Sequence, residues 1–425
     1  MLRTLFFVVL AATALRAQSP VPAPKQSGAI LVLGATAHLG NGTVIPNSAV
    51  AFDQGKITLV ADATTIRLDR SKYARIYDAS GKHVYPGLIA PDATVGLVEV
   101  GAVRATQDAS DSGPLNPQNR ALIAYNADSD IPPTLRTNGV LMVQTTPEGG
   151  LMSGFSSVVQ MDAWNWEDAA IRADDGLHIN WPYWRSQTSD PSQKKNEAYE
   201  RDVQTLRQFF DEAKAYCQKT TPDPVNLKYE ALRGIFGQKQ NLYIHVSQAR
   251  AMQEAVLFAE SYGLRPVLVG ADDAWLITDF LRGHQTPVIL GPTQRLPGRE
   301  DEAVDQPFKT SVALHNAGVL FAFSADGFWR QRNLPFMAGQ AVGFGLPKEA
   351  AISAITLNTA KILGIDAYAG SLETGKDATL FICEGDVLDM RTCVVTAAFI
   401  QGRTIDLDNK QKALTRKFNE KYSRQ

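Results

Sequence analysis

The sequence predicts an α/β protein: a (β/α)8 barrel of the TIM type joined to a composite β-sandwich formed from both chain ends. Strand-like runs alternate with helical patterns over roughly 280 residues, and such a barrel typically needs about 250. Short β-type runs lie on both flanks of this block. A doubly wound sheet is the alternative, but it would normally carry a glycine-rich turn after its first strand. The sequence has no such turn, so we expect the barrel.

The first residues predict a secretory signal. One basic residue, Arg3, precedes an apolar run from Leu5 to Leu15, followed by small residues. The run is shorter than the roughly 20 apolar residues that span a bilayer; a buried N-terminal strand is the other interpretation. We expect a signal peptide over residues 1–17, a proline-rich linker over 18–27, and export to the periplasm or the extracellular space.

The flanking segments predict a small β structure. NSAVAFDQGKITLVAD gives two short strands around a turn at residues 53–56. DATLFICEGD and CVVTAAFIQGRTI give two more near the C-terminus. We expect residues 28–85 and 366–405 to form the two parts of the sandwich. Residues 406–425 predict a charged, solvated helix with no special role.

The barrel is expected over residues 86–365. Its strands are predicted from short apolar runs that each end in polar or glycine residues: 140–150, 242–249, 265–274, 287–293 and 319–326. Amphipathic patterns lie between several of them. One of these patterns, RDVQTLRQFFDEAKAYC, places on one helical face Leu206, Phe209, Phe210, Ala213 and Tyr216.

Composition and net charge limit the kinds of binding partner that we expect. With 44% apolar and 20% charged residues the chain is globular, and a net charge of -2 gives no electrostatic reason to expect nucleic acid. We expect no membrane partner after signal cleavage. Of three cysteines, Cys383 and Cys393 form the close pair, which leaves either one disulfide between neighbouring strands or two free thiols.

Two gapped stretches resemble the amidohydrolase superfamily and its imidazolonepropionase-like members. YPGLI, at 85–89, resembles the entry from sandwich into barrel strand one. LNTAKILGIDAYAGSLETGKDATL resembles the exit, where the family pattern is T-x-N-x-A-x-x-L-G and then G-S-(L/I)-x-x-G-K-x-A-D-L, although Thr379 stands where Asp is common. The resemblance implies a hydrolase acting on carbon–nitrogen bonds of small amides or cyclic imides, with its site at the C-terminal ends of the barrel strands.

The same resemblance implies a metal site from which this chain departs. The family pattern has His-x-His after strand one, where this chain has Asp92 and Thr94. A strand-six histidine is expected near residues 269–271 and is missing from the sequence. His245 matches the strand-five histidine and Asp326 the strand-eight aspartate. The implied roles are metal binding for both, and proton transfer to the leaving nitrogen for Asp326.

Two carboxylates are candidate replacement ligands, Glu148 after the predicted strand VLMVQTT and Asp92 itself. Oxygen ligands favour Mg or Mn over zinc. We therefore expect either one divalent ion (Zn, Mn or Mg) or no metal. The alternative is a non-catalytic barrel that binds a ligand. The expected partners are a small-molecule substrate and a second copy or a related amidohydrolase.

Aromatic residues concentrate in DAWNWEDAAIRADDGLHINWPYWR, at 162–185. They either pack an insertion onto the barrel or line a pocket, so Trp164, Trp166 and Trp181 are candidate substrate-binding residues. Arg295, in the loop after 287–293, is a candidate carboxylate clamp or a solvated loop residue. Other polar residues of the aromatic stretch are expected in loops or at the surface: Asp174, Asp175 and His178.

Overall fold

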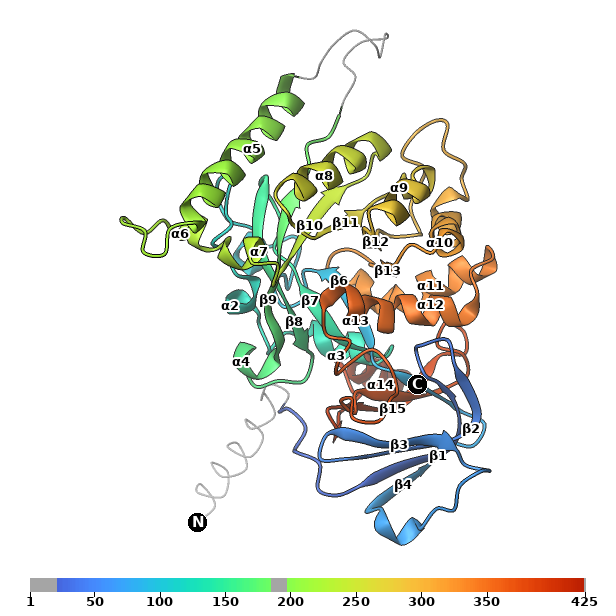
Figure 1. Cartoon of the computed structure of the whole chain (residues 1–425). Coiled ribbons are helices and arrows are strands. Elements are labelled where there is room, and N and C mark those ends of the chain that lie inside the picture. The colour runs from blue at the N-terminus through green and yellow to red at the C-terminus, as the bar shows by residue number, and fades with distance from the viewer. Residues whose placement is uncertain (1–20, 185–196, 424–425) are drawn as a thin grey trace, which may run out of the picture.

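The computed structural model describes residues 21–184 and 197–423. Two eight-stranded sheets organise the chain, with the one built from the chain ends below the barrel in Figure 1. Among the described residues we find no helix whose length and hydropathy would let it cross a bilayer.

The first sheet joins the two ends of the chain. Its strand order is β16-β15-β14-β5-β1-β2-β3, with β4 paired to β1. The strands are β1 (Ile30–His38), β2 (Val44–Asp53), β3 (Lys56–Asp62), β4 (Arg75–Asp78), β5 (His83–Pro86), β14 (Leu380–Glu384), β15 (Val394–Ile400) and β16 (Arg403–Thr404). The antiparallel pairing of β5 with β14 makes the link. Strands from both ends therefore share one sheet, whereas a two-layered sandwich stays a prediction.

The hairpin between β2 and β3 forms as the sequence predicts. Gln54 and Gly55 both have positive φ angles, 50° and 79°. Such angles at both central positions are what a two-residue hairpin turn needs, because they match the twist of the paired strands.

The second sheet forms a nearly closed barrel with strand order β13-β12-β11-β10-β9-β8-β7-β6. Its strands are β6 (Leu88–Ala93), β7 (Val140–Thr145), β8 (Met152–Gln160), β9 (Ala170–Asn180), β10 (Asn241–Val246), β11 (Pro266–Gly270), β12 (Val288–Leu290) and β13 (Phe321–Phe323). The last and first strands meet where the Ser324 hydroxyl donates to the Pro91 carbonyl, at 2.9 Å.

The expectation of eight parallel strands is wrong at β8. This strand runs antiparallel to both neighbours, β7 and β9. Only residues 146–151 separate β7 from β8, which is too short for the crossover helix that parallel strands require. The other strand pairs of the barrel are parallel, so the carboxyl ends of β6, β7 and β9 to β13 still meet at one rim.

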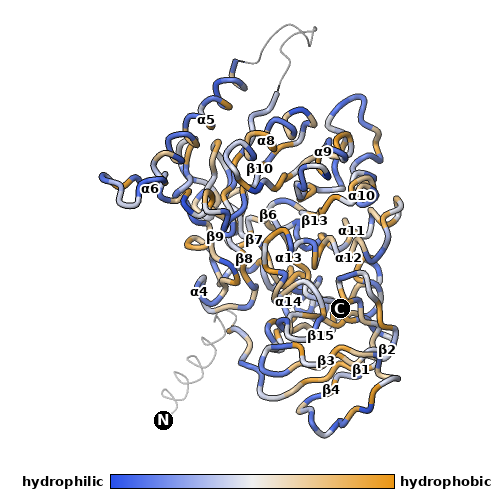
Figure 2. Tube along the Cα trace, in the orientation of Figure 1, coloured by the Kyte–Doolittle hydropathy of each residue, from blue (hydrophilic) through white to orange (hydrophobic). Residues whose placement is uncertain are grey.

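Most of the helices that the described residues form lie around the outside of the barrel, as Figure 1 shows. They are α2 (Ala121–Ala124), α3 (Ile131–Arg136), α4 (Trp166–Ala169), α5 (Glu197–Cys217), α6 (Leu227–Glu230), α7 (Arg233–Phe236), α8 (Ala249–Ser261), α9 (Thr278–Gly283), α10 (Gln306–Ala317), α11 (Leu334–Gly343), α12 (Lys348–Ala354), α13 (Leu357–Leu363) and α14 (Lys410–Ser423). Figure 2 shows hydrophilic residues along α5 and α6. Of the five residues predicted to lie on the buried face of α5, Tyr216 is partly buried and the other four are buried: Leu206, Phe209, Phe210 and Ala213. Helix α14 buries none of its residues.

The described part of the predicted linker, 21–27, has no regular secondary structure but is held in place. The Ala23 amide donates to Asp162 Oδ2 at 2.9 Å, and Arg403 from β16 pairs with the same carboxylate at 2.8 Å. This segment is therefore attached to both sheets.

Candidate active site

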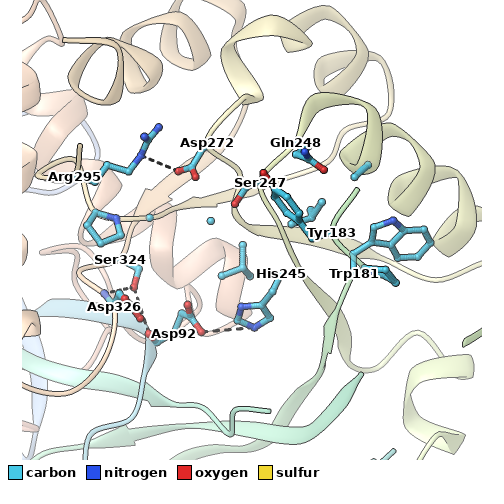
Figure 3. A pocket seen from close by; sticks show the side chains of 17 residues that line it. Asp92, Trp181, Tyr183, His245, Ser247, Gln248, Asp272, Arg295, Ser324 and Asp326 are labelled. Atoms are coloured by element: carbon cyan, nitrogen blue, oxygen red, sulfur yellow. Dashed lines mark hydrogen bonds and ion pairs between the residues drawn. The ribbon is translucent and has the colours of Figure 1, made fainter. Parts of the chain in front are cut away.

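The carboxyl ends of the barrel strands surround a cavity of about 370 Å³. Figure 3 shows Asp92 and His245 on its floor, with their side chains directed toward one another. The walls combine apolar and polar groups, among them Trp181, Val246, Val269, Ser247, Asp272 and Asp326. The cavity lies where the barrel architecture places active sites.

Three potential metal ligands converge beside this cavity: Asp92, His178 and His245. One ligand atom of each lies within 4.8 Å of the other two. His178 Nδ1 is 2.9 Å from His245 Nε2, and that nitrogen is 3.8 Å from the Asp92 carboxylate. The histidines come from the adjacent parallel strands β9 and β10, and the aspartate from β6.

A buried hydrogen-bond chain fixes the proton on His178. The Ser156 hydroxyl donates to Asp175 Oδ1 at 2.8 Å, so its oxygen is free to accept from His178 Nε2, at 2.9 Å. With its one proton on Nε2, neutral His178 presents the Nδ1 lone pair to His245 and Asp92. A metal-binding histidine usually has its second nitrogen held in this way.

Gln144 ties this chain to Asp92. Its Oε1 accepts from the Asp92 amide at 3.0 Å, while its Nε2 donates to Asp175 Oδ2 at 2.8 Å. The bond supports Asp92 in a left-handed backbone conformation, with φ 51°. The Tyr243 hydroxyl also donates to Asp175 Oδ2, at 2.6 Å.

Burial shifts the pKa values of the ionisable groups in and behind this cluster. Burial raises the pKa of Asp175 and of Asp92, and for Asp92 the His245 charge opposes this shift while Asp326 adds to it. Burial, and then the neighbouring His245, hold the pKa of His178 well below its usual value. Asp92 is thus a buried carboxyl group beside two imidazoles, of which His178 is held neutral, and a buried charge is costly without a counter-charge.

These residues fit a divalent metal ion. Two imidazoles and one carboxylate are a common protein ligand set for a catalytic zinc, and they also suit other first-row metals. The ion would bind between His178 Nδ1, His245 Nε2 and the Asp92 carboxylate. It would also place a positive charge beside the buried Asp92 carboxylate.

Asp326 and Glu148 lie at the edge of this cluster. Asp326 lines the cavity, pairs with Arg330 at 3.3 Å, and leaves its side chain 51% exposed. Glu148 lies in the loop after β7, where partial desolvation of its carboxyl group, and then the nearby charges of Asp92 and Asp326, raise its pKa. Among the described residues, neither belongs to the group whose ligand atoms lie within 4.8 Å. Of the two, Asp326 lines the cavity and is therefore placed to act on a substrate more readily than to hold the ion.

The three tryptophans predicted to bind substrate do not lie together. Trp181, 6% exposed, lines the cavity. Trp164 is 64% exposed and lines a different cavity, while Trp166 packs against the large core.

Arg295 also lines the cavity, but it pairs with Asp272 at 3.0 Å and with Glu302 at 2.6 Å. Its guanidinium is thus occupied by carboxylates of the chain itself. Thr94 is 4% exposed, and its amide donates to the Gly327 carbonyl at 3.3 Å, a bond that helps to close the barrel.

The expectation that Asp175 and His178 lie in loops or at the surface is wrong. Both are fully buried, at 0% exposure, in the strand β9. The order Leu177-His178-Ile179 indicates a strand, because a polar residue alternates with two apolar ones, but it does not indicate that the polar residue is buried. Asp174 is partly exposed and pairs with Arg120 at 2.8 Å.

Comparison with known proteins supports the interpretation of the fold. A model of the amidohydrolase family matches residues 303–405. An amidohydrolase from Thermotoga maritima MSB8 superposes with a TM-score of 0.78 at 24% identity, covering 89% of this chain and 99% of that one. A search of curated proteins finds no match.

More distant solved structures share the fold as well. An adenosine deaminase from Xanthomonas campestris with bound zinc gives a TM-score of 0.54 at 16% identity, covering 94% of this chain and 99% of that one. A Xaa-Pro dipeptidase with bound methionine gives 0.54 at 14% identity, with coverages of 89% and 100%. The resemblance of this chain to the amidohydrolase superfamily is therefore confirmed, by sequence over residues 303–405 and by fold over most of its length.

Proposed function

We propose that this protein is a divalent-metal-dependent hydrolase of carbon–nitrogen bonds in small amides or cyclic imides. The observation that carries the proposal is the convergence of His178, His245 and Asp92 in front of the buried Asp175. The similar deaminase and dipeptidase, by their names, also act on carbon–nitrogen bonds. A divalent ion bound there would supply Lewis-acid activation of a carbonyl and of water.

The chain's own groups prepare the site for this chemistry. Ser156 holds the His178 proton on Nε2 and so keeps Nδ1 available. Trp181, Val246 and Val269 give the cavity an apolar wall, which favours a small ring or acyl group and limits access of water. The cavity volume, about 370 Å³, suits a compact substrate.

Asp326 is the group best placed to move a proton. Its carboxylate lies at the rim of the cavity, close enough to Asp92 to influence that residue's pKa. It can take up the proton released by the attacking water and deliver it to the leaving nitrogen, as general acid–base catalysis requires. Arg330 pairs with this carboxylate at 3.3 Å.

The test is a hydrolysis screen. Metal-stripped protein is reloaded with Zn, Mn or Mg and assayed against linear amides and cyclic imides. Hydrolysis by the reloaded wild type is expected, and Asp326→Asn should lower kcat by about 100-fold or more, the usual contribution of acid–base catalysis. His245→Ala should abolish the activity together with metal binding.

His284→Ala is the matched control, because that histidine lies on the surface and pairs with Glu260 at 2.8 Å. It should leave the activity unchanged. Full metal occupancy without hydrolysis of any substrate class, in wild type as in Asp326→Asn, would favour the alternative of a non-catalytic barrel that binds a ligand.

A further inference from the structure

Two cysteines face each other at the base of the loop between β14 and β15. Cys383 lies in β14 and is fully buried, and Cys393 directly precedes β15 and is partly buried. Their sulfur atoms are 3.7 Å apart, with the Cys383 thiol donating toward Cys393. Both pack on the large core that includes the barrel.

The backbone at this point is already closed. A Cβ atom placed on Gly385 would lie 2.7 Å from both the Cβ and the carbonyl oxygen of Thr392, so the two segments touch two residues beyond Cys383 and one residue before Cys393. The Cys393 amide also donates to the Asp389 carbonyl, at 2.9 Å. The two sulfur atoms can therefore reach bonding distance by rotation of their side chains, because the backbone segments beside them are already in contact.

The loop that the cysteines enclose joins the first sheet to the barrel. Asp386 pairs with Lys348 of α12 at 2.9 Å. The Leu388 carbonyl lies so close to Gly339 of α11 that a Cβ there would be 2.1 Å from it. Val387 and Leu388 are buried in the large core. A covalent tie across the loop would hold these contacts together.

The geometry points to Cys383 and Cys393 as a redox-active pair that closes to an intramolecular disulfide by exchange with a low-molecular-weight disulfide such as glutathione disulfide. The Cys393 thiolate attacks one sulfur of glutathione disulfide and expels a glutathione thiolate. Cys383 then loses its proton and attacks the Cys393 sulfur, expelling the second. Two protein thiols are oxidised, glutathione disulfide is reduced to two glutathiones, and the two protons pass to the released thiolates.

The roles follow from exposure and charge. Cys393 is the more accessible sulfur, and the hydrogen bond from Cys383 lowers the pKa of its thiol. The same hydrogen bond, followed by burial, raises the pKa of Cys383. Cys393 is therefore the attacking group and Cys383 the group that resolves the mixed disulfide.

The test uses the whole chain, reduced and then incubated with glutathione disulfide. Alkylation in denaturant should label all three cysteines before oxidation and Cys217 alone afterwards. Trypsin cuts after Arg391, between the pair, so the disulfide should appear as two joined peptides that separate on reduction. The melting temperature should rise by about 3 °C, as expected for closing a short loop in a chain of this size.

Cys217→Ser is the matched control and should oxidise and gain stability as the wild type does. Cys393→Ser should show neither the joined peptides nor the rise in melting temperature. Labelling of all three cysteines after oxidation would overturn the inference, and so would a stable glutathione adduct on Cys393 with no joined peptides.

Discussion

Asp175→Asn changes one buried oxygen into an amide nitrogen without changing the shape of the side chain. Oδ2 accepts two hydrogen bonds, from Gln144 and Tyr243, and Oδ1 accepts one, from Ser156. The asparagine should keep its oxygen at the Oδ2 position, where two donors point, and place its NH2 group toward Ser156. The Ser156 hydroxyl should then turn its hydrogen toward His178 Nε2, at 2.9 Å, in preference to the more distant Gly176 carbonyl, at 3.3 Å.

That rotation changes the tautomer of His178, because Nε2 must then accept a hydrogen bond. Neutral His178 would now carry its proton on Nδ1, the atom that faces His245 and Asp92, and could not bind a metal there. Loss of such a supporting partner lowers metal affinity by about 10–100-fold, or about 1.4–2.8 kcal/mol. The metal-free fold should be unharmed, because every hydrogen bond keeps a donor and an acceptor and one buried charge is removed.

The assay compares zinc affinity and melting temperature in the same metal-stripped preparations. Asp175→Asn should bind zinc at least 10-fold more weakly than the wild type while melting at or above its temperature. Ser156→Ala should weaken binding in the same direction, since His178 Nε2 loses its acceptor. Zinc affinity equal to that of the wild type in Asp175→Asn would refute the proposed proton arrangement.

Three further predictions concern His178, the end of β6 and export. The free energy of unfolding of the metal-free wild type should fall as the pH drops below about 6.5, by up to 1.4 kcal/mol per pH unit. The reason is that His178 takes up a proton in the unfolded state, whereas its lowered pKa excludes that proton from the folded state. A His178→Asn variant whose stability depends on pH as steeply as that of the wild type would contradict this. Asp92→His should raise the zinc affinity measured by titration. Thr94→His should instead lower the free energy of unfolding by about 1–3 kcal/mol, because Thr94 is buried. A higher zinc affinity in Thr94→His would contradict this assignment of the two residues at the end of β6. For export, the mature chain from its native host should begin between residues 15 and 18 by intact mass, and a retained Met1 would argue against the signal peptide.

The strands that were predictable are those whose apolar side chains form a continuous buried run. Strands β10, β11, β12 and β13 are of this kind, and the predicted ranges contain or overlap them. The cavity residues that match the family pattern, His245 and Asp326, follow from the same segments because the motif fixes their position at a strand end.

Strands β8 and β9 were not predictable in this way, because they bury polar residues. Ser156, Asp175 and His178 are all fully buried, and each is satisfied by a partner on a neighbouring strand. The hydropathy of one segment alone predicts that such polar residues lie at the surface or in a loop, because the partners that satisfy them are distant in sequence. The third candidate ligand, His178, was missed for this reason.

The most direct test of the metal site is a crystal structure of the protein loaded with zinc, with anomalous diffraction measured at the zinc absorption edge. The account predicts one strong anomalous peak per chain, within bonding distance of His178 Nδ1, His245 Nε2 and the Asp92 carboxylate. The Ser156 hydroxyl should remain hydrogen-bonded to His178 Nε2. A zinc-loaded crystal with no peak among these three residues, and His178 and His245 still bonded to each other, would contradict it.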